Sequence, residues 1–234
     1  PGARIMTSEK EQRPGEERAG PGRDAVEEQQ SASGGQIDFE TIPLVAIKVI
    51  TNPVDFYQDM KKGGGYLEPL VFMVALSVAA GVLSAVLSVF GFGMATAMTA
   101  GLIAVILVPV FVVIFSFIGA GIAYVIWKMM GSHEDFETAF RCVAYTAAIA
   151  PINAVLGVIP YLGSIVSAIW PMALLAIASI HVHRRSPQVS WAVFGALGIL
   201  LAVIGLGGER TSRQMADQMQ DWQQMMEDAR RQSD

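Results

Sequence analysis

The chain has 234 residues, of which 53% are hydrophobic and 16% are charged, and its formal net charge is −5. The charges lie almost wholly in the tails and loops, which fits one membrane domain with polar ends and leaves no basic patch for a nucleic-acid partner. Cys142 is the only cysteine, so an internal disulfide and a cysteine-based metal framework are excluded.

The first 38 residues are rich in Glu, Gln, Arg, Gly and Pro and nearly lack large apolar side chains. Such a segment cannot bury enough surface to offset its ordering entropy, so residues 1–38 are predicted to be a disordered cytoplasmic tail. They are also too polar for the hydrophobic part of a signal peptide. We therefore expect the first membrane span to act as an uncleaved insertion signal.

Residues 39–66 are predicted to form a juxtamembrane segment. Its apolar part is interrupted by Lys48, Pro53 and Asp55, so it is too short to span and suits a helix in the headgroup layer. Its aromatic residues are expected to anchor at the interface, namely Phe56, Tyr57 and Tyr66. The Lys-Lys-Gly-Gly-Gly sequence that follows is predicted to be a flexible hinge.

Three runs without Asp, Glu, Lys, Arg or His dominate the chain. They cover residues 69–127, 142–180 and 186–208, which are 59, 39 and 23 residues long. Because about 20 helical residues cross a bilayer, the runs hold two, two and one spans. The predicted fold is an all-α integral membrane protein with a five-helix transmembrane bundle over residues 67–208.

Turn and capping residues place the connections. A turn is expected at residues 91–93, a kink at Pro109, and a tight reversal at residues 159–163. In the polar loop after the second span, Ser132 and Asp135 have capping-box spacing and are predicted to start the third helix. Lys and Arg gather at one side of the predicted spans, which places the N-terminus in the cytoplasm and the C-terminus outside.

The predicted spans contain no charged side chain at depth, which argues against proton-coupled and ion-coupled transport. Their polar groups, such as Asn153, are interpreted as helix-packing contacts. Small residues at i, i+4 spacing indicate close helix contacts, taken as intramolecular; they are Ser77, Gly81 and Ala85, Gly119 and Ala123, and Gly198 and Ala202.

No arrangement of residues predicts catalysis, a cofactor or a metal. His181 and His183 point to different helix faces and, beside two arginines, are expected to meet phosphate headgroups. The acidic residues near 133–137 are interpreted as a solvated helix start.

Residues 209–234 are predicted to form an amphipathic C-terminal helix. An apolar stripe recurs every three or four residues, at Met215, Met219, Trp222, Met226 and Ala229. Dimerisation, packing on the membrane surface and a loosely ordered extension remain alternatives, and a marginal interfacial or partner-bound helix is the preferred one.

From the second span onward the chain resembles the Yip (Ypt-interacting protein) family of membrane proteins. The resemblance rests on the order of WKMMG at 127–131, FRCVAYTAAIAP at 140–151, IPYLG at 159–163 and IW at 169–170. It implies a five-span domain with a cytoplasmic N-terminus. The residues that it marks as structural are Pro69, Gly131, Tyr145, Pro151, Pro160, Gly163 and Trp170.

Eukaryotic members of that family associate with Rab-type GTPases. The long N-terminal tail and the external C-terminal tail of this chain are closer to bacterial members, so small-GTPase binding is expected only of a eukaryotic-type relative. A bacterial inner membrane is the expected location.

These features favour a non-catalytic scaffold or adaptor whose partners are membrane lipid and either a second copy or another membrane protein. The alternative is a permease or channel for a neutral or lipid-like solute.

Overall fold

The structure is a computed structural model that describes residues 39–90 and 101–233. Within these residues it is all-helical, and five of its helical segments are long and apolar enough to cross a membrane. The predicted all-α fold with five spans is therefore confirmed. The predicted N-terminal tail and the turn at residues 91–93 lie outside the described residues.

The juxtamembrane segment forms two short helices, α2 (Thr41–Thr51) and α3 (Pro53–Asp59). Pro53 sits in the first turn of α3, where its missing N–H costs nothing. Phe56 and Tyr57 are buried in the protein core, and the Tyr57 hydroxyl donates to the Cys142 carbonyl at 3.3 Å. The prediction that these two rings anchor in the headgroup layer is therefore wrong, because they pack against other helices.

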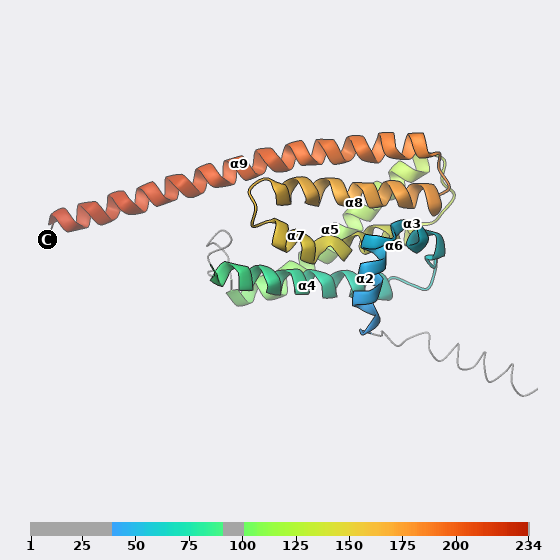
Figure 1. The fold of residues 1–234 in the computed structure, drawn as a ribbon, viewed down its shortest axis with the longest axis horizontal. Coiled ribbons are helices and arrows are strands. Elements are labelled where there is room, and N and C mark those ends of the chain that lie inside the picture. The colour runs from blue at the N-terminus through green and yellow to red at the C-terminus, as the bar shows by residue number, and fades with distance from the viewer. Residues whose placement is uncertain (1–38, 91–100, 234) are drawn as a thin grey trace, which may run out of the picture. The chain divides into compact units, whose positions relative to one another are not determined.

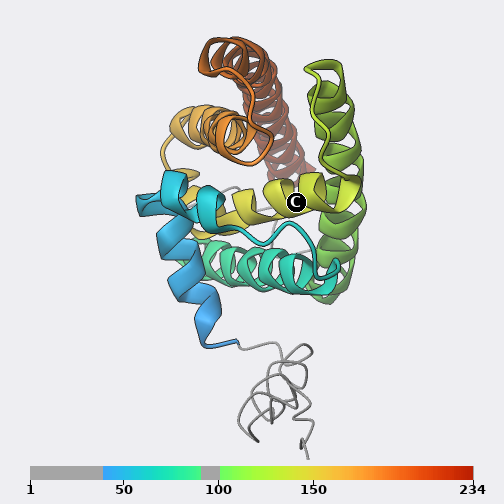
Figure 2. The same ribbon diagram turned by 90° about the vertical axis from the view of Figure 1, so that its right-hand side faces the viewer.

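The first two spans are α4 (Leu67–Val89) and α5 (Gly101–Met129). The predicted third span is broken into α6 (Phe136–Tyr145), the 3₁₀ turn η2 (Thr146–Ile149) and α7 (Ala150–Leu156). Pro151 lies in the first turn of α7 and has no N–H to donate, so one helix hydrogen bond is missing here and a break at this point is favoured. In Figure 1 the α6–η2–α7 segment lies between α4 and α8, and Figure 2 shows α6 reaching across to α5.

The last two spans are α8 (Leu162–His181) and α9 (Pro187–Ser233), which lie side by side (Figure 1). A buried hydrogen bond of 2.9 Å from Ser190 Oγ to Ser179 Oγ joins them. α9 is one helix of 47 residues, so it continues through the change of composition at residues 208 and 209. The segment from 187 to 233 contains no Pro after its first residue, and the helix is not interrupted at Gly207 and Gly208.

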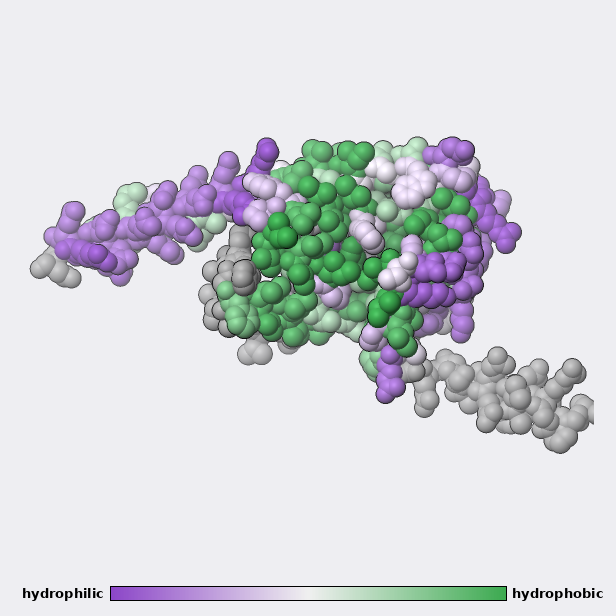
Figure 3. All heavy atoms as spheres, viewed as in Figure 1, coloured by the Kyte–Doolittle hydropathy of each residue, from purple (hydrophilic) through white to green (hydrophobic). Residues whose placement is uncertain are grey.

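Large apolar side chains cover the outward faces of these helices. Ile114, Ile118 and Ile122 along α5 are each about half exposed, as are Val82 in α4 and Val203 in α9. Figure 3 shows the resulting apolar surface over the body of the helices and polar residues along the far half of α9. Exposed apolar area on this scale requires a lipid surrounding, so the chain is an integral multi-pass membrane protein.

The small-residue faces do not all pack within the chain. A Cβ on Gly198 would lie 3.2 Å from the Met172 side chain, so this glycine brings α9 close to α8. A Cβ on Gly81 would meet nothing within 4 Å among the described residues, and Ala85 is exposed. The predicted intramolecular packing therefore holds for Gly198 and is wrong for Gly81 in this part of the chain.

Candidate functional site

In the described part of the chain, polar side chains gather in two places, one at each end of α8. The first, here called the Arg141 cluster, consists of Lys62, Gly65, Glu68, Glu137 and Arg141. The second, here called the Glu209 pocket, lies where the α7–α8 turn meets α9. Since α8 has 20 residues, the two places are roughly 30 Å apart along the helix axis.

The Arg141 cluster ties the glycine loop before α4 to α6. Arg141 is 1% exposed, and its Nη2 donates to the Gly65 carbonyl at 3.0 Å and to Glu68 Oε2 at 3.2 Å. Glu137 Oε1 accepts the Gly65 N–H at 2.7 Å and lies 3.7 Å from Arg141 Nε. Gly64 has φ +118° and Gly65 φ +85°, which favour glycine. The predicted flexible hinge is therefore wrong, because these contacts hold the loop.

Lys62 and the start of α6 complete the same end of the bundle. Lys62 Nζ donates to Glu134 Oε1 and to the Val182 carbonyl, at 2.5 and 3.3 Å. Asp135 caps α6 by accepting the Thr138 N–H at 2.9 Å, and this hydrogen bond lowers the pKa of Asp135. Of the two residues predicted to start the third helix, Asp135 is therefore the N-cap, and the helix begins at Phe136, while Ser132 does not cap it.

Ser132 instead faces a buried histidine. Its Oγ lies 2.8 Å from His183 Nδ1, and the His183 ring stacks on Trp127 at 3.8 Å between centroids. His183 is 2% exposed. Burial lowers its pKa to about 3, and the nearby Lys62 adds to this effect. The expected headgroup contact is wrong for His183, because its ring is enclosed by protein.

The buried His183 predicts a specific loss of stability in acid. Its folded pKa of about 3 lies below the ordinary 6.5, so between these values the unfolded chain binds the proton more readily. Stability therefore falls as pH drops through this window, by about 2 kcal/mol at pH 5. Thermal unfolding midpoints in detergent at pH 7.5 and 5 measure this loss.

His183→Gln is expected to show a smaller fall between the two pH values than the parent protein. His181→Gln is the matched control, because His181 is partly exposed and contacts Gln58 at 3.1 Å. An equal fall for the parent and His183→Gln would contradict the prediction.

The residues marked as structural by the family resemblance do not form one site. Tyr145 packs against Phe56 and Phe72, and its hydroxyl lies 3.5 Å from Glu68 beside the Arg141 cluster. Gly131 has φ +85°, and a Cβ there would lie 3.1 Å from Arg185 Nη1.

The remaining positions are spread along the bundle. Pro69 is buried near the start of α4, Pro151 opens α7, and Trp170 is 40% exposed on α8. Pro160 lies in the α7–α8 turn, and Gly163 lines the Glu209 pocket. Their structural role stays a prediction.

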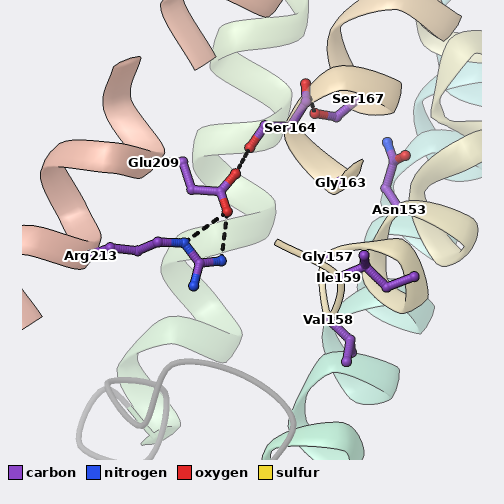
Figure 4. Close-up of a pocket in the computed structure, with 9 residues that line it drawn as sticks. All are labelled: Asn153, Gly157, Val158, Ile159, Gly163, Ser164, Ser167, Glu209 and Arg213. Carbon is purple, nitrogen blue, oxygen red and sulfur yellow. Dashed lines mark hydrogen bonds and ion pairs between the residues drawn. The ribbon is translucent and has the colours of Figure 1, made fainter. Parts of the chain in front are cut away.

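The Glu209 pocket has a volume of about 500 Å³ (Figure 4). Its walls come from α7, the α7–α8 turn, α8 and α9, and the lining residues are Asn153, Gly157, Val158, Ile159, Gly163, Ser164, Ser167, Glu209 and Arg213. Glu209 and Arg213 enter from α9, while Asn153 lies on the opposite side. The pocket is thus assembled from parts of the chain separated by more than 40 residues.

Glu209 organises one wall of this pocket. Its carboxylate accepts hydrogen bonds from the Tyr161 N–H at 2.9 Å, from the Ser164 hydroxyl, and from Arg213 Nε and Nη2 at 3.1 and 2.6 Å. Tyr161 has φ +65°, and Arg213 lies 5.4 Å from its ring centroid. These contacts fasten α9 to the α7–α8 turn.

Asn153 supplies the opposite wall. Its Oδ1 is buried and has no hydrogen-bond partner among the described residues. Ser167 Oγ donates to the Ser164 carbonyl at 3.1 Å, which leaves its lone pairs for a further donor. The arrangement provides acceptors and one guanidinium in a partly apolar cavity, which suits recognition of a small polar group.

Reasoning from sequence missed Arg141, Glu68 and Glu209 as site residues. From sequence alone, Arg141 falls at the end of the polar loop after the second span, and Glu209 at the start of the C-terminal tail. The spacing of Glu137 and Arg141, which is i, i+4, was the available signal for a charged pair on one helix face. No local pattern connects Glu209 with Ser164, because 45 residues separate them.

Comparison with known proteins yields one family. No curated protein and no solved structure shows a significant match to the chain. The sequence model of the Yip1 domain matches residues 47–208, which covers more than half of the chain and contains all five predicted spans. With its multi-pass helical fold, the chain therefore belongs to the Yip1 domain family.

Proposed function

We propose that this protein is a non-catalytic scaffold or adaptor that acts through protein contacts within the membrane. Membership of the Yip1 domain family supports this function. In the Arg141 cluster the guanidinium bonds Glu68 and the Gly65 carbonyl and lies within ion-pair distance of Glu137, which suits a role in holding the fold. The observation that carries the proposal is the unpacked small-residue face of α4.

This face consists of Ser77, Gly81 and Ala85. It leaves the backbone of α4 accessible, since a Cβ on Gly81 would meet nothing within 4 Å among the described residues. Helices in lipid associate through close backbone approach, which small residues permit. A second copy of the chain or another membrane protein is therefore the proposed partner of α4.

Gly81→Ile tests this assignment. A branched side chain on the face would keep a partner helix away, so we expect at least about tenfold weaker self-association, equivalent to about 1.4 kcal/mol. Mass measurement of the purified protein in mild detergent over a concentration series gives the monomer fraction.

Gly195→Ile is the matched control, because Gly195 is also a helical glycine, and a Cβ there would meet no atom within 4 Å in the part of the chain that the structure describes. A parent protein that is strictly monomeric and co-purifies with no partner would contradict the scaffold function. Unchanged assembly of Gly81→Ile would contradict the role of α4 in it.

A permease for a neutral or lipid-like solute is the second candidate, and the Glu209 pocket favours it. The pocket lies at one end of the bundle and includes Asn153, whereas Tyr145 lies beside the Arg141 cluster. Solute flux into reconstituted vesicles that is lost in Asn153→Leu would support this function over the scaffold.

We also propose a bacterial inner membrane as the location, with the N-terminus in the cytoplasm and the C-terminus outside. The excess of Lys and Arg at the Arg141 end supports this orientation, and the long polar tails support a bacterial-type member. Reporter fusions after residues 65 and 230 test it, and a cytoplasmic signal from both would contradict it.

A further inference from the structure

We propose that the Glu209 pocket binds the headgroup of an ethanolamine phospholipid. The acceptors near Asn153 and Ser167 take the primary ammonium, and Arg213 takes the phosphate. This site is independent of the scaffold function, because it uses α7, α8 and α9 and not the small-residue face of α4.

One acceptor of the pocket, the Asn153 side-chain oxygen, lacks a donor in the described part of the chain. Asn153 Oδ1 is buried without a partner among the described residues, and a buried acceptor in that state is unfavourable until a donor reaches it. The Ser167 hydroxyl donates its hydrogen bond to the Ser164 carbonyl, so toward a ligand its oxygen can only accept. A ligand that pairs with these two oxygens must therefore carry N–H or O–H groups.

The opposite side offers a cation. Arg213 uses Nε and Nη2 to bond Glu209 Oε1, which leaves Nη1 without a bond to the described residues. Its side chain is 43% exposed, so it is reachable from the membrane boundary. A guanidinium whose position is fixed by a carboxylate is well suited to bind a phosphate oxygen.

The position of the pocket favours a lipid headgroup as the ligand that carries the N–H donors and the phosphate. Its volume of about 500 Å³ falls within the roughly 300–1,000 Å³ of small-molecule sites. Ile159 on its rim is 51% exposed. Figure 3 shows the apolar surface giving way to polar residues where α9 leaves the other helices, which is where headgroups would lie.

The choice of ethanolamine over choline follows from hydrogen bonding. An ethanolamine ammonium has three N–H donors, whereas a trimethylated choline nitrogen has none and cannot satisfy Asn153 Oδ1. A glycerol headgroup carries neutral hydroxyl donors, whose hydrogen bonds to the oxygens of Asn153 and Ser167 are weaker than those of an ammonium. The pocket also includes Glu209 and Arg213, which lie just beyond the residues matched by the family model.

The test is native mass spectrometry of the full chain in detergent, with phospholipids that share acyl chains and carry ethanolamine, choline or glycerol headgroups. We expect at least tenfold stronger retention of the ethanolamine lipid than of the other two. Asn153→Leu should remove most of this preference, and Ser167→Ala should reduce it several-fold. Equal retention of the ethanolamine and choline lipids would overturn the proposal.

Ser116→Ala is the matched control for Ser167→Ala. Each hydroxyl donates to the carbonyl three residues earlier, at 2.7 Å for Ser116 and 3.1 Å for Ser167, but Ser116 lies on α5 and does not line the pocket. An unchanged preference in both Ser167→Ala and a folded Asn153→Leu would overturn the proposal. Folding of each variant is checked by its thermal unfolding midpoint.

Free phosphoethanolamine separates a lipid from a soluble source. If the soluble compound displaces the lipid only at much higher concentration, the lipid assignment is supported, because the acyl chains and the bilayer boundary add to binding. Displacement at equal concentration would overturn the lipid assignment in favour of a soluble zwitterion.

Discussion

Arg141→Ala is expected to lower the free energy of unfolding by about 3 kcal/mol, because it removes the charge that holds two carboxylates and a carbonyl together. Arg141 is 1% exposed and bonds the Gly65 carbonyl and Glu68. Without it, Glu137 stays largely enclosed with its charge uncompensated. Glu68 is 59% exposed and regains water, which keeps the loss at the low end of the range for buried pairs. Thermal or denaturant unfolding in detergent measures the change.

Arg231→Ala is the control for this prediction. Arg231 also bonds a glutamate four residues earlier, at 2.6 Å, but both side chains are well exposed. Exposed pairs of this kind contribute about 0.3–0.5 kcal/mol. A loss below about 1 kcal/mol for Arg141→Ala would show that the cluster does not stabilise the bundle. Increased proteolysis at residues 61–66 would accompany a real loss, since the loop is released.

Gly163→Ala is expected to cost about 2 kcal/mol through overpacking. A Cβ at residue 163 would lie 2.7 Å from Gly157 Cα and 3.0 Å from Gly157 N. Both neighbours are backbone atoms, so no side chain can turn away to make room. The α7–α8 turn would have to open, which would also move Tyr161 and Ser164 away from Glu209. Unfolding in detergent measures the stability.

Gly195→Ala is the control for the helical glycine itself. A Cβ there meets nothing within 4 Å among residues 39–90 and 101–233, so alanine should be neutral or stabilising by up to about 1 kcal/mol. If Gly163→Ala and Gly195→Ala stabilise the protein to the same extent, the prediction that the backbones approach closely at Gly157 and Gly163 is wrong. Loss of the ethanolamine-lipid preference in Gly163→Ala would further indicate that the turn shapes the Glu209 pocket.

The two ends of α8 share a common design. At each end a carboxylate and an arginine connect a glycine-containing loop to a neighbouring helix: Glu137 and Arg141 hold the loop at Gly65, and Glu209 and Arg213 hold the turn at Tyr161. Loops at membrane depth need their backbone groups satisfied. We expect these charged pairs to set the angle at which α4 and α9 leave their loops.

The spans were determined by the sequence itself. Uncharged apolar runs of these lengths lie in hydrocarbon for two reasons. A charged side chain at that depth is costly, and so much apolar surface is unfavourable in water. The same holds for the reversal after Pro160 and for the helical character of the C-terminal tail, where local spacing and turn residues are sufficient.

The contacts of individual polar residues were decided only by the tertiary structure. Arg141 meets Glu68 across 73 residues, and Ser132 meets His183 across 51, so their burial depends on which helices become neighbours. Phe56 and Tyr57 are aromatic residues of the type that anchors at a membrane interface, yet the packing of neighbouring helices buries both. The open face at Gly81 has the same local pattern as the packed one at Gly198, because small residues permit close approach without specifying the partner.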